Sequence, residues 1–367
     1  MPIARQQSPR ARPSKRPGKS TRVADLAVSP ATSPMEARLA PSLPRGAAWR
    51  YEPKWDGFRC LAFRTGDDVD LRAKSGKPLA RYFPDVVSLL RELPSDRFVI
   101  DGELVIPIGD VLSFDALQAR LHPAESRVRR LVAEAPARFI LFDILAADGE
   151  NLLEKPLRSR RAALEKLHAR SPDHARLRLS PWTADRAEAQ RWLERAGGAL
   201  DGVVAKNRED IYRAGERAMI KVKCLRTADC VVGGFRYATG SREIGSLLLG
   251  LYNSDGKLDH VGFTATIRHA ERPALTRRLE RFIGAPGFNG KAPGGKSRWS
   301  GERSEEWQPL RPKLVVEVRY DQVTGDRFRH GTKLLRWRPD KSPRQCELGQ
   351  LRHEVRPSEL LDRIIDR

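Results

Sequence analysis

The pattern of apolar and polar positions divides the chain into unlike segments. Residues 1–45 are rich in Pro, Ser, Ala and Arg and carry no sustained period, so we expect a disordered arm. From Trp49 onward, short apolar runs typical of strands alternate with stretches whose apolar residues recur at helical spacing. Strands are predicted over residues 59–64, 69–73, 97–101, 104–108, 138–145, 202–206 and 219–223, and helices over 84–93, 113–121 and from Pro156 through Leu167.

The pattern becomes mostly that of strands after about residue 226. Runs at residues 230–237, 246–252, 258–263 and 314–320 accompany one predicted helix, 271–283, and a Gly/Pro-rich stretch, 284–301. These features are typical of a small barrel of the OB type. Because the earlier strands come in adjacent pairs, we predict an α+β fold with antiparallel sheets. The predicted units are a basic arm (1–45), a first domain (46–226), an OB-fold domain (227–352) and a C-terminal tail (353–367).

The charge of the chain points to a polyanionic partner. The 367 residues include 68 Lys and Arg against 47 Asp and Glu, a net charge of +21. Seven of the basic residues lie in residues 1–22, which hold no acidic residue, and the rest of the chain is also basic. Such a balance favours nucleic acid as a partner, since neutralised phosphates release counterions.

Several protein classes are excluded on the same grounds. No apolar run approaches the roughly 20 residues that span a bilayer, and the N-terminus lacks the apolar segment of a secretory signal. The four cysteines are scattered without a C-x-x-C pair, which argues against a zinc ribbon or a disulfide framework. We therefore predict a cytoplasmic protein that does not bind membranes.

The strongest chemical signal is the run from Glu52 to Arg59, which contains K-x-D-G-x-R. Lys54 precedes an Asp-Gly turn where one predicted strand ends and the next begins. A lysine shielded from water and surrounded by other cations loses its proton more easily and becomes a nucleophile. An ordinary hairpin with a surface lysine would give the same six residues, so the run alone decides nothing.

Four further segments repeat the theme of an acid, an aromatic or a lysine at a strand end. Each could be a solvated strand edge, but lysines inside apolar strands are costly unless they meet an anion. All five segments in this order therefore indicate a phosphate site with a nucleophile, metal-binding acids and a stacking aromatic. The four segments carry Glu103, Phe142, Asp201 with Lys206, and Lys221 with Lys223.

In order and spacing, the five segments resemble the nucleotidyltransferase motifs of ATP-dependent DNA ligases. That superfamily also contains RNA ligases and mRNA capping enzymes. Residues 311–318, 328–330 and 336–341 resemble the OB-domain ending of bacterial ATP-dependent DNA ligases, and residues 244–250 and 292–300 resemble stand-alone C-type ligases of actinobacteria. The resemblance covers about residues 45–350 and implies a nucleotidyltransferase (adenylation) domain followed by the OB-fold domain.

The resemblance implies ATP-dependent sealing of nicked duplex DNA in three steps. Lys54 would attack the α-phosphate of ATP, the AMP would pass to the 5′-phosphate at the nick, and the 3′-hydroxyl would then displace AMP. Asp201 stands where most DNA ligases have Glu, and Lys74 stands for the Arg of a Ser-Arg-Asn-Gly segment. The resemblance implies that Glu52 contacts adenine, that Phe142 stacks on the base, and that Arg59 and Glu103 contact the ribose or phosphate, with Lys74 also on the nucleotide. Lys206, Lys221 and Lys223 would hold the α-phosphate, and Glu103 and Asp201 would bind Mg²⁺ (or Mn²⁺). Arg338, Asp340 and Lys341 would orient the leaving pyrophosphate.

Three alternatives remain open from the residues. An RNA ligase would share the first domain, and a capping enzyme would use GTP in place of ATP. A non-catalytic nucleic-acid-binding OB protein would keep the shell without the chemistry. The match through Arg338–Lys341 favours a DNA ligase, for which we expect a monomer that acts in DNA repair, at the nucleoid, with repair polymerases or other repair proteins as possible partners.

Overall fold

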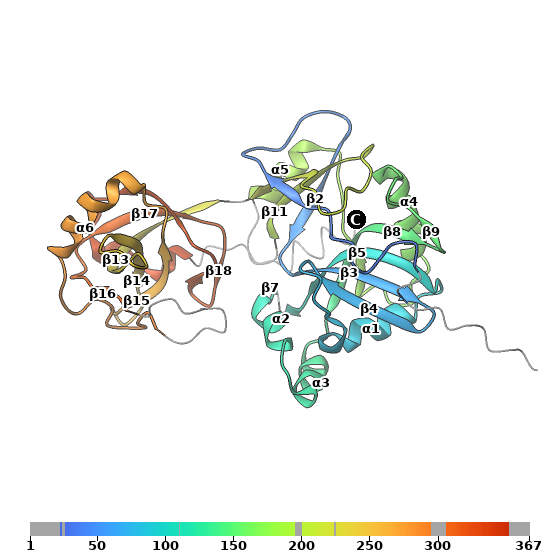
Figure 1. The fold of residues 1–367 in the computed structure, drawn as a ribbon, viewed down its shortest axis with the longest axis horizontal. Coiled ribbons are helices and arrows are strands. Elements are labelled where there is room, and N and C mark those ends of the chain that lie inside the picture. Colours follow the sequence, from blue (N-terminus) through green and yellow to red (C-terminus); the bar gives the residue numbers. More distant parts are fainter. Residues whose placement is uncertain are drawn as a thin grey trace, which may run out of the picture.

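A computed structural model describes residue 23 and residues 26–109, 111–194, 200–223, 225–294 and 306–351. Within these ranges the chain forms two domains that meet near residue 225, each built around its own sheets (Figure 1). Residues 1–22 of the predicted arm and the predicted tail lie outside the described residues. None of the helices in the described ranges combines the length and the apolar character that a membrane crossing requires.

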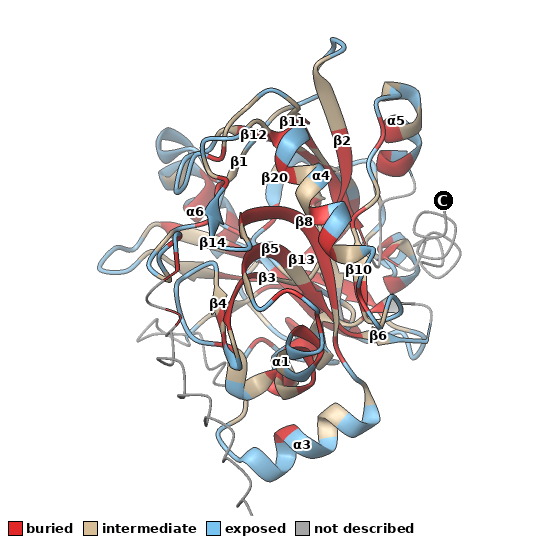
Figure 2. Ribbon diagram, turned by 90° about the vertical axis from the view of Figure 1, so that its right-hand side faces the viewer, coloured by how far each residue is buried: buried red, intermediate tan, exposed pale blue. Residues whose placement is uncertain are grey.

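Two sheets build the first domain, and most of their strands pair antiparallel, as predicted. The smaller sheet has the order β1 (Ala37–Leu39), β12 (Met219–Lys223), β11 (Leu200–Asn207), β2 (Trp49–Trp55). The larger sheet has the order β10 (Leu177–Leu179), β8 (Arg138–Ala147), β5 (Arg97–Val105), β3 (Phe58–Thr65), β4 (Asp68–Ala73), with β9 (Glu150–Asn151) paired to β8. Figure 2 shows that the middle strands of the larger sheet are buried along their length.

Three helices of the first domain begin where the sequence pattern places them, namely α1 (Pro84–Arg91), α2 (Phe114–Arg120) and α4 (Leu157–His168), whereas α3 (Glu125–Glu134) and α5 (Arg186–Glu194) were not predicted. α2 is capped by Ser113, whose hydroxyl accepts a hydrogen bond from the Ala116 amide. α4 begins directly after Pro156. The remaining strands, β6 (Pro107–Ile108) and β7 (Val111–Leu112), form a short pair.

The Asp56–Gly57 turn does not close a hairpin. β2 belongs to the smaller sheet and β3 to the larger one, so the chain crosses from sheet to sheet at this turn. Gly57 is required there, because a Cβ atom at this position would lie 2.2 Å from the Leu104 carbonyl oxygen. The crossing places Lys54 and Arg59 on different sheets that face each other.

The two strands predicted around Asp101 and Gly102 form one continuous strand, β5, whose pairing with β8 shifts register between these two residues. A Cβ atom on Gly102 would lie 2.6 Å from the Ile140 carbonyl oxygen. The glycine therefore marks a close approach of two strands, and not the break between strands that its turn propensity suggests.

The segment from residue 26 to residue 45 differs from the disordered arm that its composition predicts. Leu26, Val28 and Met35 are buried in a small core against the larger sheet. β1 then pairs in parallel with β12, with Ala37 opposite Met219. A few well-placed apolar residues therefore outweigh the Pro- and Ser-rich composition.

The second domain is a curled sheet with the strand content of an OB barrel, as predicted. A bridge between Thr264 and Thr332 joins the end of one edge strand to the start of the other. α6 (Arg272–Glu280) packs Leu275 and Leu279 into the core. The strand order is β15 (Leu258–Thr264), β14 (Ile244–Tyr252), β13 (Arg226–Tyr237), β17 (Val315–Tyr320), β20 (Lys333–Trp337), with β16 (Gln308–Pro309) beside β13 and a separate hairpin of β18 (Val323–Thr324) and β19 (Arg327–Phe328).

A buried ion pair ties α4 to the larger sheet. Arg160 donates to both carboxylate oxygens of Asp143, at 2.8 and 2.9 Å, and the two side chains are 1% and 2% exposed. On the same helix, Arg158 pairs with Glu209, but these side chains are each 51% exposed. The two arginines therefore form matched buried and exposed pairs.

We predict that Arg160→Met lowers the free energy of unfolding by about 3 kcal/mol, because Asp143 keeps a buried charge without its partner. Arg158→Met should change it by less than about 0.5 kcal/mol, since exposed pairs contribute little. Urea denaturation of both variants measures the difference. Equal losses in the two variants would contradict the prediction.

Candidate active site

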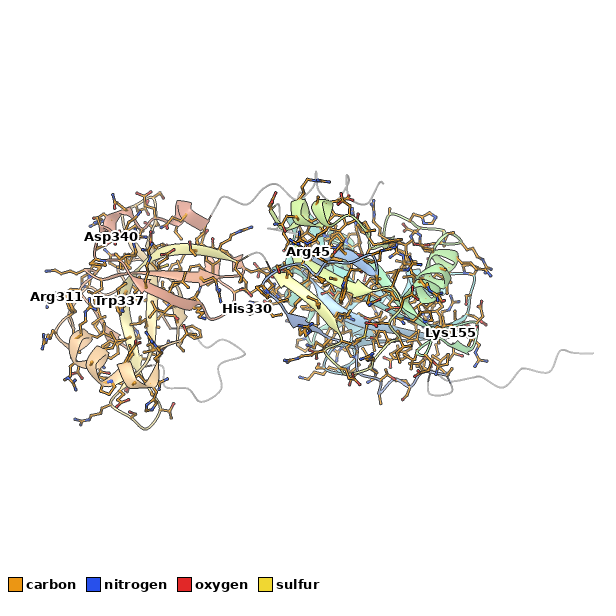
Figure 3. The ribbon with its side chains drawn as sticks, turned by 90° about the horizontal axis from the view of Figure 1, so that it is seen from above. Arg45, Lys155, Arg311, His330, Trp337 and Asp340 are labelled. Carbon is orange, nitrogen blue, oxygen red and sulfur yellow. The ribbon has the colours of Figure 1, made fainter. Side chains whose placement is uncertain are left out.

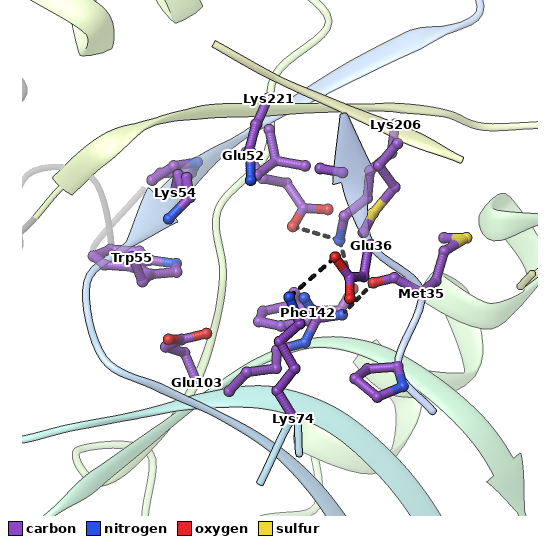
Figure 4. Close-up of a pocket in the computed structure, with 16 residues that line it drawn as sticks. Met35, Glu36, Glu52, Lys54, Trp55, Lys74, Glu103, Phe142, Lys206 and Lys221 are labelled. Carbon is purple, nitrogen blue, oxygen red and sulfur yellow. Dashed lines mark hydrogen bonds and ion pairs between the residues drawn. The ribbon is translucent and has the colours of Figure 1, made fainter. Parts of the chain in front are cut away.

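A pocket of about 210 Å³ lies between the two sheets of the first domain. Its lining contains five cations and three carboxylates, so it suits a ligand with several negative charges. Figure 4 shows Lys54, Lys206 and Lys221 on one side, with Glu103 and Lys74 opposite. The residues named from the sequence that line it are Glu52, Lys54, Arg59, Lys74, Glu103, Phe142, Lys206 and Lys221.

Lys54, at the end of β2, is held by a carboxylate from the neighbouring strand β11. Its Nζ lies 2.6 Å from Asp201 Oδ2, and the Lys54 side chain is 25% exposed while Asp201 is 5% exposed. The second oxygen, Oδ1 of Asp201, is buried without a hydrogen-bond partner. Asp201 thus has an acceptor to spare beside a partly accessible amine.

The far end of the pocket carries a buried pair beside an aromatic ring. Lys206 Nζ donates to Glu52 Oε2 at 2.8 Å and lies 4.7 Å from the centre of the Phe142 ring. The Arg59 guanidinium also lies over this ring, at 4.6 Å. An aromatic face that attracts cations also stacks on nucleobases, so a base bound here would take the place of a cation on the Phe142 ring.

Arg59 is fixed by residues that the sequence analysis did not select. It donates to both oxygens of Asp101, which also accepts from the Tyr212 hydroxyl at 2.6 Å, and to the Met35 carbonyl oxygen at 3.2 Å. Burial acts to lower the pKa of Arg59, but the charge and hydrogen bonds of Asp101 outweigh burial, so the pKa is raised above its ordinary value. Arg59 therefore stays charged and oriented in the pocket.

The N-terminal segment supplies one wall of the pocket. Glu36, next to β1, pairs with Lys74 at 3.0 Å, and Arg217 lies 3.8 Å from the same oxygen. The hydrogen bond from Lys74 lowers the pKa of Glu36 and outweighs the effect of burial. Sequence reasoning missed Met35 and Glu36 because they lie in the segment expected to be disordered; the buried Leu26, Val28 and Met35 were the available signal.

The two lysines of β12 face different partners. Lys221 lines the pocket, and burial lowers its pKa, assisted by the charges of Lys54 and Lys223. Lys223 lies 3.1 Å from Asp201 and 2.8 Å from Asp321, which belongs to the second domain. Burial acts to lower the pKa of Lys223, but these two carboxylates raise it.

Glu103, on β5, is half-buried in the pocket wall. Burial raises its pKa to about 7, against the opposing charges of Lys54 and Arg59. Within the described ranges, no group of three or more His, Cys, Asp or Glu side chains gathers as a metal site. Carboxylates such as Glu103 and Asp201 are the donors that Mg²⁺ uses when it shares its coordination with phosphates and water.

The terminal motif lies away from this pocket. Arg338 binds Asp229 at 2.8 and 3.0 Å and Asp340 at 2.8 Å, and Lys341 lies 3.8 Å from Asp229. None of the described residues that line the pocket comes from the second domain. The structure therefore brings eight of the selected residues together, sets Asp201 and Lys223 beside them, and keeps Arg338, Asp340 and Lys341 apart.

Comparisons with known proteins agree along most of the chain. A family model described as "ATP dependent DNA ligase domain" matches residues 34–223, and one described as "ATP dependent DNA ligase C terminal region" matches residues 240–341. The chain is 46% identical over 343 residues to DNA ligase C of Mycobacterium tuberculosis, and the aligned region covers 89% of this chain and 95% of that protein. It is 44% identical over 344 residues to DNA ligase C2 of Mycolicibacterium smegmatis, with 89% and 96% covered.

A solved structure from a study of Lig E DNA ligases has a similar fold. It covers 83% of this chain and 99% of its own, with a TM-score of 0.54. At 19% identity this likeness bears on the fold alone. It agrees with a two-domain arrangement of mixed sheets followed by an OB barrel.

The raised pKa of Glu103 predicts a pH-dependent stability. Because the folded chain favours the protonated carboxyl, the stability it contributes is complete below its ordinary value of 4.5 and is lost as the pH rises through about 7. Glu103→Gln cannot ionise, so its advantage over the wild type in free energy of unfolding should be about 2 kcal/mol larger at pH 8 than at pH 5. Urea denaturation in EDTA tests this, and a difference that is equal at both pH values would contradict it.

Proposed function

The chain belongs to the ATP-dependent DNA ligases, and we propose that it uses ATP to seal nicks in duplex DNA through a covalent AMP carried on Lys54. Lys54 supports this proposal because it is a partly accessible amine of a cation-rich pocket and lies 2.6 Å from a buried carboxylate. An amine in that setting has both a phosphate-binding environment and an acceptor for its proton.

In the first step, Lys54 Nζ attacks the α-phosphorus of ATP. The new N–P bond forms as the bond to the β-phosphate oxygen breaks, and pyrophosphate leaves. Asp201 Oδ2 is placed to take the proton that Nζ must lose. Because such displacements on phosphorus depend mainly on positioning and charge neutralisation, the surrounding lysines carry much of the catalysis.

The pocket offers a place for each part of the nucleotide. The Phe142 ring would stack on adenine, with Glu52 as the hydrogen-bonding group beside it and Lys206 released toward the phosphate. Arg59 and Glu103 would meet the ribose or the phosphate, and Lys74 the same ligand from the opposite wall. Lys221 and Lys223 project from one strand beside Lys54 and would hold the α-phosphate.

Glu103 and Asp201 would hold Mg²⁺, or Mn²⁺, which prefers the same oxygen donors. Both are carboxylates near Lys54, and the unpaired, buried Oδ1 of Asp201 fits a donor that lacks its partner. When bound, the ion supplies positive charge that neutralises the phosphates. Mg²⁺ is commonly bound by only one or two carboxylates together with phosphate oxygens, so two acids are sufficient.

The next two steps use DNA. The 5′-phosphate at the nick attacks the α-phosphorus of Lys54-AMP and frees Lys54, and the 3′-hydroxyl then attacks that 5′-phosphate and releases AMP. Arg338, Asp340 and Lys341 would orient pyrophosphate in the first step, which requires the OB domain to turn toward the pocket. Domain closure of this kind commonly assembles a catalytic site only when substrate is bound.

We place this activity in DNA repair, in the cytoplasm at the nucleoid, with nicked duplex DNA as substrate and repair proteins as partners. The basic surface of the two domains would bind the DNA, and the protein would act as a monomer. The net charge of +21 supports the binding of DNA.

The first test is covalent labelling of the protein with Mg²⁺ and ATP. We predict that label enters from α-labelled ATP and not from γ-labelled ATP, because pyrophosphate leaves. Lys54→Ala should abolish labelling and nick sealing, whereas Lys166→Ala, an exposed lysine on α4, should retain both.

Other outcomes of this assay would support the alternatives. Label from GTP alone would indicate a capping enzyme, and sealing of nicked RNA alone would indicate an RNA ligase. A folded protein that takes no label and binds nucleic acid would be a non-catalytic OB protein. Sealing of nicked duplex DNA after labelling with ATP is the expected result.

We also predict that binding to nicked DNA weakens steeply with salt. For about four neutralised phosphates, raising NaCl from about 50 to about 200 mM should weaken the affinity about a hundredfold. Fluorescence anisotropy with a labelled nicked duplex measures this slope. An affinity that hardly changes over this range would show that phosphate contacts contribute little to binding.

A further inference from the structure

A chain of ion pairs runs from the proposed nucleophile across the domain boundary. Lys54 binds Asp201 at 2.6 Å, Asp201 is 3.1 Å from Lys223, and Lys223 Nζ donates to Asp321 Oδ2 at 2.8 Å. Asp321 directly follows β17 and also lies 3.1 Å from His330 Nδ1. Figure 3 shows His330 where the two domains meet.

A second contact joins the first domain to the hairpin β18–β19 of the OB domain, which begins shortly after Asp321. Arg329 binds both oxygens of Asp56 at 2.6 and 2.7 Å, and its guanidinium lies 3.2 Å from the centre of the Phe114 ring. Asp56 is two residues from Lys54. The hairpin β18–β19 with its flanking residues therefore contacts the first domain beside the proposed active site.

The Lys223–Asp321 pair is partly withdrawn from solvent. The two side chains are 17% and 20% exposed. Although burial acts to raise the pKa of Asp321, its hydrogen bonds with His330 and Lys223 lower it strongly. An ion pair this shielded from solvent stabilises the contact between the domains more than an exposed pair does, and losing one of its two members costs more free energy.

The nucleotide and Asp321 compete for the same ammonium group. Lys223 has three N–H donors, and in this structure Asp201 and Asp321 both face it. An α-phosphate held by Lys223 would bring its own negative charge next to the Asp321 carboxylate. Because Asp201 already faces Lys223, a phosphate would be a third anion on one ammonium group, and its repulsion weakens the contact of Lys223 with Asp321.

We propose that Asp321 is a positioning residue that occupies Lys223 while the α-phosphate position is empty, and so holds the OB domain in the orientation seen here. ATP replaces Asp321 on Lys223 and so weakens the attachment of the hairpin, which then depends on the contact of Arg329 with Asp56. The OB domain then turns more easily to bring Arg338 and its neighbours to the pyrophosphate. This inference rests on the proposed function, since it needs Lys223 to bind the nucleotide.

If Asp321 occupies Lys223, ATP binds less tightly than it would to the pocket alone. Only molecules whose Lys223 is free bind ATP fully, so the apparent affinity is reduced by that fraction. Removing the carboxylate should therefore lower the KM for ATP and leave the chemical step nearly unchanged. Loss of a purely structural contact would raise KM or lower kcat instead.

The test measures self-labelling of the full-length protein with α-labelled ATP over a range of ATP concentrations. For Asp321→Asn we expect the ATP concentration at half the maximal labelling rate, used here as KM, to be about three- to tenfold lower, and the maximal labelling rate, used as kcat, to stay within about twofold of the wild type. Asp326→Asn is the matched control, since it removes the same charge from the same hairpin at a left-handed position that Asn tolerates. Asp321→Ser serves as a second variant, and circular dichroism verifies that all three are folded.

Small-angle X-ray scattering of the ATP-free proteins gives the second readout. Asp321→Asn should change the scattering profile in the direction that ATP changes the wild type, whereas Asp326→Asn should leave it unchanged. A KM in both Asp321 variants that equals or exceeds that of the wild type would overturn the proposal. If the wild type takes no label at all, the proposed function fails; if it is labelled and the variants match it, only the role of Asp321 fails.

Discussion

Opposite charges at close range hold the side chains of the proposed active site in place. Five cations around one small pocket repel one another, and burial adds to the cost of each charge. The structure meets this constraint with carboxylates placed in hydrogen-bond contact, among them Asp201 for Lys54 and Glu52 for Lys206. A phosphate-rich ligand would provide the same neutralisation, so ligand binding exchanges one set of partners for another and does not need new cations.

The geometry that makes this exchange possible comes from the crossing at Asp56 and Gly57. Because the chain passes from one sheet to the other within a few residues, Lys54 and Arg59 approach one pocket from separate walls. The wall formed by the larger sheet is firmly packed, since the strands that carry Glu103 and Phe142 lie in the interior of that sheet and are buried. The hairpin that the sequence suggests would have put both side chains on a single ladder.

The sequence predicted those pocket residues that stand out from their apolar neighbours. Lys54, Glu103 and Lys221 each end or interrupt an apolar strand, where a charged side chain is costly unless it meets an opposite charge. Glu36 could not be found in this way, because its place in the pocket depends on a strand that pairs with residues far along the chain. The position of Arg338 depends on the orientation of a whole domain. That orientation is set by contacts such as Lys223–Asp321, which produce no periodic pattern in the sequence.

The parallel pairing of β1 with β12 also bears on how the protein is made. One wall of the pocket, next to Ala37, is completed only when Met219 joins it, so the site combines an early and a late part of the chain. Contacts between such distant residues form slowly, because the long loop between them must close first. During synthesis, a nascent chain that already displays the Lys54 segment still lacks the strand that supplies Lys221, and nucleotide binding has to wait until the whole first domain has left the ribosome.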